Sequence, residues 1–274
     1  MGLAVLALAQ ITALDFHFLL TNSDLIICFT ATFLGYNFIK FHRFLIHKKE
    51  IKIKGFSILL GFLLISALLF LARFFLMPLS SQLLLFLTLV LVLIYCLPLP
   101  GLKINFRGFR GFKIHLVAIS WVITTVFLPL SIADIPLTEW SCFYTLQRYL
   151  FVLVATLPFE IRDLKMDDPH LSTWPQKWGI PKTKMLGVIL LLSFMVLEGY
   201  FLTSEHTVIT TFIILILMAA VLISKGEQSK YFSSFWVEGI PILWLVLRHN
   251  LISVSYTHLR AHETLRYLVC RLLL

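Results

Sequence analysis

The sequence predicts an all-α polytopic membrane helical bundle with about nine transmembrane helices. Of its 274 residues, 59% are hydrophobic and only 14% are charged, and the mean hydropathy is +0.92. This composition lies outside the range of soluble globular domains. The apolar residues also gather in runs of roughly 20, the length that crosses the hydrocarbon core of a bilayer.

Nine apolar runs follow one another along the chain. The first is the weakest, because Asp15 and His17 interrupt it, and we expect it to be a clipped span. The longest connection, about 161–183, is too short for a soluble domain, so we expect one membrane domain. The runs cover about residues 2–20, 24–46, 55–77, 81–98, 113–132, 139–160, 184–203, 206–224 and 235–252.

The basic residues alternate between the connections. Lys and Arg cluster after the second, fourth, sixth and eighth runs and are absent from the connections after the first, third, fifth and seventh. By the positive-inside rule, the basic connections and the N-terminus are cytoplasmic. We therefore expect an integral protein of a bacterial inner membrane, surrounded by membrane lipids. The net charge of +9 then reflects topology, and we expect no nucleic-acid partner.

The C-terminal residues 253–274 differ from the rest of the chain. Their sequence, "SVSYTHLRAHETLRYLVCRLLL", resembles translated adapter or vector sequence. After nine spans this segment would also place three arginines on the outer side of the membrane. We therefore expect a transmembrane domain over residues 1–252 and a foreign tail over 253–274. The alternative is an amphipathic helix that lies on the membrane surface.

An acidic cluster, "FEIRDLKMDD", ends the sixth apolar run. At 100° per residue, Glu160, Asp163 and Asp167 lie within an arc of roughly 60° on a helix. Acids at membrane depth normally face a cavity or a partner, because exposure to lipid is costly. Mg²⁺ is a suitable partner, since it binds carboxylate and phosphate oxygens. The alternative is a solvated helix end before Pro169, with local pairing.

The stretch "EIRDLKMDDPHLSTWPQKWGIPKTK", residues 160–184, resembles the UbiA-type intramembrane prenyltransferases. The second aspartate motif of that family, DxxDxxxD, reads here as Glu160, Asp163 and Asp167. The "TWPQKWG" that follows resembles the loop that enters the family's seventh helix, and the resemblance covers about residues 1–252. It implies transfer of a prenyl group from a prenyl diphosphate to an acceptor. It also implies Mg²⁺ bound between two aspartate motifs in a cytoplasmic-side pocket.

The first aspartate motif of the family, NDxxDxxxD, is largely absent. In "NFIKFHRFL" Asn37 is retained, but Phe38, Phe41 and Leu45 stand where the three aspartates are expected. Phe and Leu cannot bind Mg²⁺. The chain therefore resembles a divergent member that lacks half of the metal site.

Three basic residues are candidate ligands of a diphosphate, together with Asn37. Lys40 lies one turn after Asn37 and could replace the metal as counter-charge of the acids, or it could extend to the lipid headgroups. Arg107 and Arg110 in "NFRGFRGFK" could clamp a diphosphate, or they are ordinary loop charges. No catalytic residue is assigned.

Two functions follow. The first is a divergent, Mg²⁺-dependent prenyltransferase that uses Glu160, Asp163 and Asp167 as metal ligands. The second is a catalytically inactive member that binds a prenyl lipid or a membrane partner, with Lys40 in place of the metal charge.

Overall fold

A computed structural model describes residues 1–46, 56–96, 111–166, 172–201, 204–229 and 231–249. Within these residues every regular element is a helix, so the predicted all-α class is confirmed. The predicted foreign tail, 253–274, lies outside the described residues, as do Arg107, Arg110 and Asp167.

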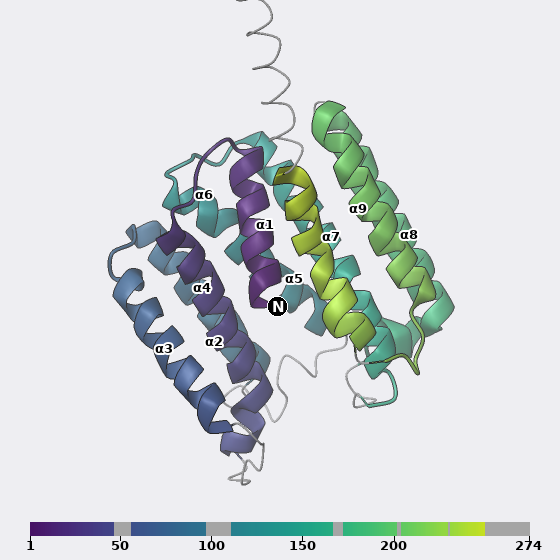
Figure 1. Cartoon of the computed structure of the whole chain (residues 1–274). Coiled ribbons are helices and arrows are strands. Elements are labelled where there is room, and N and C mark those ends of the chain that lie inside the picture. The colour runs from purple at the N-terminus through teal and green to yellow at the C-terminus, as the bar shows by residue number, and fades with distance from the viewer. Residues whose placement is uncertain (47–55, 97–110, 167–171, 202–203, 230, 250–274) are drawn as a thin grey trace, which may run out of the picture.

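The helices run up and down through one bundle (Figure 1). The segments α5, η2 and α6 form one continuous helix, and η4 is the π-helical start of a helix over residues 231–249, called here the η4 helix. The bounds are α1 Gly2–Asp15, α2 Asn22–Ile46, α3 Phe56–Phe74, α4 Leu79–Cys96, α5 Lys113–Val122, η2 Ile123–Phe127, α6 Leu128–Ile132, α7 Glu139–Asp163, α8 Trp174–Phe201, α9 Ser204–Ile223 and η4 Phe232–Val237.

Six helices of the described residues are long and apolar enough to cross a membrane. Two further apolar helices, Gly2–Asp15 and Thr207–Ile223, are shorter. These helices identify an integral membrane protein, while the count of nine spans stays a prediction. The first helix ends five residues before the predicted limit, because His17 adopts a left-handed conformation with φ of 57°.

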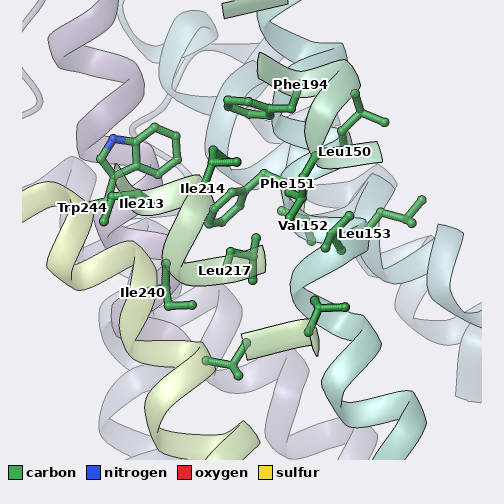
Figure 2. Close-up of a cluster of buried hydrophobic side chains, with 14 of the residues drawn as sticks. Leu150, Phe151, Val152, Leu153, Phe194, Ile213, Ile214, Leu217, Ile240 and Trp244 are labelled. Carbon is green, nitrogen blue, oxygen red and sulfur yellow. The ribbon is translucent and has the colours of Figure 1, made fainter. Parts of the chain in front are cut away.

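The main hydrophobic core lies between α7, α8, α9 and the η4 helix. Figure 2 shows Phe151 of α7 among Ile214 and Leu217 of α9 and Ile240 of the η4 helix. The rings of Phe151 and Trp244 lie 5.2 Å apart, which fixes the η4 helix against α7. By contrast α3 packs mainly on α2 and exposes most of its leucines, as expected of a helix that faces lipid.

Gly187 of α8 allows the helices of this core to approach closely. A Cβ atom at Gly187 would lie 2.8 Å from Leu157 Cδ1 and 3.2 Å from Val221 Cγ1, so any side chain there forces these buried side chains of α7 and α9 to move. Gly61 of α3 has no atom within 4 Å of the same position.

We expect Gly187→Val to lower the free energy of unfolding by about 1–3 kcal/mol, because it overpacks the contact between three helices. The midpoint of thermal unfolding in detergent measures this effect. The matched control is Gly61→Val, which adds the same side chain in open space. Equal shifts for the two variants would contradict the close contact at Gly187.

Candidate functional site

The helices α2, α4, α7 and α9 finish at one end of the bundle, here called the basic end. The end of α7 and the first residues of α5 and of the η4 helix meet there. The carboxyl end of α7 carries Glu160, Arg162 and Asp163, and Lys113 begins α5. The π-helical turn that opens the η4 helix brings Ser233 and Ser234 to the same place. The acids of α7 therefore lie among groups from two other parts of the chain.

These ends enclose a cavity of about 290 Å³, here called the polar chamber. Its wall combines charged groups near the basic end with aromatic and aliphatic groups deeper in the bundle. The polar residues that line it are Tyr36, Tyr95, Lys113, Thr156, Glu160, Arg162, Asp163, Ser234 and Glu238.

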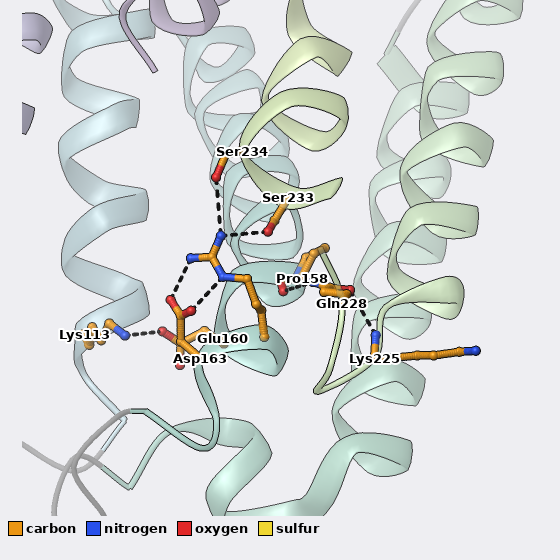
Figure 3. Close-up of polar contacts among 9 residues, drawn as sticks. Lys113, Pro158, Glu160, Asp163, Lys225, Gln228, Ser233 and Ser234 are labelled. Carbon is orange, nitrogen blue, oxygen red and sulfur yellow. Dashed lines mark hydrogen bonds and ion pairs between the residues drawn. The ribbon is translucent and has the colours of Figure 1, made fainter. Parts of the chain in front are cut away.

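Both described acids of the α7 cluster form ion pairs within the protein (Figure 3). Lys113 Nζ lies 3.0 Å from Glu160 Oε1, and both side chains are largely buried. Arg162 binds Asp163 through two parallel hydrogen bonds, from Nε at 2.7 Å and from Nη2 at 2.9 Å. The acids are therefore already neutralised, and the pairing is close to the bidentate geometry that Arg favours with carboxylates.

The η4 helix holds Arg162 from its other side. Arg162 Nη1 donates to Ser233 Oγ at 2.9 Å and to Ser234 Oγ at 3.3 Å. The loop before this helix is tied to α7 by Gln228, whose Nε2 donates to the carbonyl oxygen of Pro158 at 2.7 Å. The guanidinium group is consequently fixed between α7 and the η4 helix.

A second tie joins the loops at the basic end. Lys165 Nζ lies 2.5 Å from Glu227 Oε1, and this hydrogen bond lowers the pKa of the Glu227 carboxyl. Both side chains are exposed, so the contact adds little stability.

A second cavity, of about 230 Å³, lies between α2, α4 and α5 and is here called the apolar chamber. Carbon atoms form most of its wall, with Thr32, Thr88 and Thr124 among few polar residues. The two chambers adjoin, since five residues line both of them. These are Met1, Tyr36, Tyr95, Val117 and Trp121. Together they form an amphiphilic space with one charged and one apolar end.

The structure brings together only some of the predicted site residues. Glu160 and Asp163 both line the polar chamber, as the shared helix face predicts. Asp167, Arg107 and Arg110 fall outside the described residues.

The candidates on α2 do not reach the chambers. The residues of α2 that line the chambers are Ala31, Thr32, Gly35, Tyr36 and Ile39. On an ideal helix Asn37 points about 170° and Lys40 about 110° away from the mean direction of these five residues. Asn37 is buried and donates from its side chain to the carbonyl oxygen of Phe33 at 2.8 Å.

Lys40 occupies a different environment from the expected one. It is exposed, and its Nζ lies 5.3 Å from the centre of the Phe41 ring. The ion-pair partners of Glu160 and Asp163 are Lys113 and Arg162 instead. The expectation for Lys40 differs from the structure because the face of α2 that lines the chambers carries Tyr36 and Ile39, and Lys40 points away from that face.

Sequence reasoning missed Lys113, because it counted this residue among the topological charges of a loop. The available signal was its place at the first position of an apolar run, where a lysine can turn into the bundle. Ser233, Ser234 and Tyr36 carried no comparable signal, since isolated hydroxyl groups at membrane interfaces are common.

The described residues do not fit a resident Mg²⁺. Within them no group of three or more His, Cys, Asp or Glu side chains is placed to hold a metal ion. A magnesium ion at the acids would have to displace Lys113 from Glu160 and Arg162 from Asp163.

Comparisons with known proteins identify the fold. The apo structure of a UbiA homolog from Aeropyrum pernix K1 matches with a TM-score of 0.61 and 14% identity, over 93% of this chain and 98% of that one. The structure of a UbiA homolog from Archaeoglobus fulgidus matches with a TM-score of 0.50 and 14% identity, over 92% and 88%. No family model and no curated protein matches the sequence. The protein is therefore a helical membrane protein with a UbiA-like fold.

We expect Lys113→Ala to raise the affinity of the acids for Mg²⁺ by about tenfold, equivalent to about 1.4 kcal/mol, because it frees Glu160 from its ammonium partner. Isothermal titration of the purified protein with MgCl₂ measures the change. Lys40→Ala is the control and should leave the affinity unaltered. A larger effect at Lys40 than at Lys113 would restore Lys40 as the counter-charge.

Proposed function

We propose that the protein binds a prenyl diphosphate and transfers its prenyl group to an acceptor. The observation that carries this proposal is the amphiphilic space, in which a charged chamber continues into an apolar one. The UbiA-like fold supports it, since the two similar structures are of UbiA homologs. We also propose that the basic end faces the cytoplasm of a bacterial inner membrane, in accord with the positive-inside rule.

The apolar chamber suits an isoprenoid chain. Its walls come from α2, α4 and α5, and burial of hydrocarbon there is favourable by about 0.8 kcal/mol for each CH₂ group. Gly35 and Ala31 line this space, and their small side chains leave room for a ligand. The isoprenoid would then enter from the lipid with its headgroup in the polar chamber.

Lys113 and Arg162 are side-chain cations that line the polar chamber, where the headgroup would lie. A diphosphate would compete with Glu160 for Lys113 and with Asp163 for Arg162, whose planar guanidinium suits phosphate oxygens. In the transfer the C–O bond to the prenyl carbon breaks and the diphosphate leaves with the electron pair. The two cations offset its growing negative charge, and the acceptor bonds to the prenyl carbon and gives up its proton to the released diphosphate.

A second candidate is an inactive protein that binds the same lipid. It is favoured by the ion pairs, which neutralise the acids without a metal, and by Phe38, Phe41 and Leu45 in place of the first aspartate motif. Both candidates require the lipid to bind in the same space, so turnover separates them.

We expect Gly35→Phe to weaken binding of geranylgeranyl diphosphate by about tenfold, because the ring fills the apolar chamber. A Cβ atom at Gly35 meets only Val92 Cγ2, at 3.9 Å, so the new side chain can be accommodated. Equilibrium binding of the radiolabelled ligand measures the change, with Gly61→Phe on the lipid-facing α3 as control. Unaltered binding in the Gly35 variant would contradict the placement of the isoprenoid chain in this chamber.

We expect the protein to release diphosphate from labelled prenyl diphosphates when a membrane lipid extract supplies the acceptor. Arg162→Ala should lower the rate by about 10²–10³-fold, because the leaving group loses a charged donor. Lys165→Ala, which removes an exposed cation nearby, is the control. Saturable binding without any diphosphate release, with or without Mg²⁺, would establish the inactive alternative.

A further inference from the structure

A second group of buried ionisable residues lies in the other half of the bundle. Gln147 and Arg148 of α7 precede Glu160 by at least twelve residues, a separation of roughly 18 Å along the helix. They meet Asp15 at the end of α1, Glu198 of α8 and Arg248 of the η4 helix around one small cavity. The polar chamber shares none of these residues.

One ion pair of this group is direct. Arg248 donates from Nη2 to Asp15 Oδ1, and Tyr144 donates from its hydroxyl to Asp15 Oδ2 at 2.9 Å. Both members of the pair are almost wholly buried. The pair connects the end of α1 to the η4 helix, 233 residues further along the chain.

The other two charges of the group have no such partner among the described residues. Arg148 is only 3% exposed, and its contacts are neutral: it donates to the hydroxyls of Tyr144 and Thr12 and lies 5.5 Å from the Trp244 ring. Glu198, also 3% exposed, accepts at Oε2 from Gln147 Nε2 at 2.9 Å. An unpaired charge buried at membrane depth costs free energy. Arg148 and an ionised Glu198 therefore each need a counter-charge.

Four polar atoms around the cavity lack a hydrogen-bond partner among the described residues. They are Glu198 Oε1, Arg148 Nη1, Arg248 Nε and Trp244 Nε1. All four residues line the same cavity of about 10 Å³, which is about the space that one water molecule needs. Buried polar atoms in native proteins nearly always have a partner, and the three donors and one acceptor here belong to residues that line a single space.

We propose that this cavity is a water-binding site that links Glu198 to Arg148 and Arg248. A water molecule donates one hydrogen to Glu198 Oε1 and accepts from two of the three nitrogen donors. The bridge supplies Arg148 with its counter-charge, so that two cations and two carboxylates balance within the bundle. The water also completes a hydrogen-bonded polar network that joins α1, α7, α8 and the η4 helix. This network lies in the half of the protein away from the polar chamber.

The effect of charge balance on stability distinguishes this coupled network from a set of independent contacts. Glu198→Gln leaves the arginine unbalanced, and Arg148→Met leaves the glutamate unbalanced, whereas the double variant is neutral. If Glu198 instead held a proton in the wild-type protein, the first substitution would remove no charge and the two effects would add.

The experiment is a double-mutant cycle in which the midpoint of thermal unfolding in detergent is measured for each protein. We expect each single substitution to lower the midpoint by about 5–10 °C and the double variant to lose clearly less than the sum. Glu139→Gln, at an exposed acid of α7, should add to Arg148→Met without coupling. Additive effects for Glu198 and Arg148 would overturn the proposal.

A high-resolution structure of the wild-type protein tests the water directly and does not depend on the stability of any variant. We expect solvent density within hydrogen-bond distance of Glu198 Oε1 and of an arginine nitrogen. An empty cavity, or a direct contact between Glu198 and Arg148, would overturn the proposal.

Discussion

A charged side chain buried in a bundle that lipid surrounds needs a charged or hydrogen-bonding partner within the protein. The helix α7 contributes to two buried polar regions in which this constraint shapes the structure. At its carboxyl end Glu160 and Asp163 are paired with Lys113 and Arg162. In its other half Arg148 lies among groups of α1, α8 and the η4 helix. Between the two polar regions α7 is apolar and forms the core in Figure 2, so packing and electrostatics both converge on this helix.

The two π-helical segments border the amphiphilic space. Thr124 of η2 lines the apolar chamber, while Ser234 and Val237 of η4 line the polar chamber. A π-helical turn inserts a residue into the helix and is frequent at functional sites. In η4 it directs two serine hydroxyls toward Arg162, a contact that joins the η4 helix to the acidic end of α7.

The fold could be predicted largely from the sequence, because the length of apolar runs and the alternation of basic connections follow from the bilayer itself. The acidic cluster could be located too, since Glu160 and Asp163 share one helix face. The partners could not, because the contacts of Lys113 with Glu160 and of Asp15 with Arg248 join helices whose rotation depends on tertiary packing. Glu198 and Arg148 did carry a signal that went unused, as ionisable residues in the middle of apolar runs.

The ion pairs of the polar chamber also bear on how a diphosphate would bind. The headgroup must take Lys113 from Glu160 and Arg162 from Asp163, and Glu238 adds a third acid to the same wall. Opening a buried ion pair leaves its carboxylate unpaired, which opposes binding. The apolar chamber must then supply much of the affinity, at about 0.8 kcal/mol per buried CH₂ group. The length of the isoprenoid chain should consequently govern selection more strongly than the charge of the headgroup.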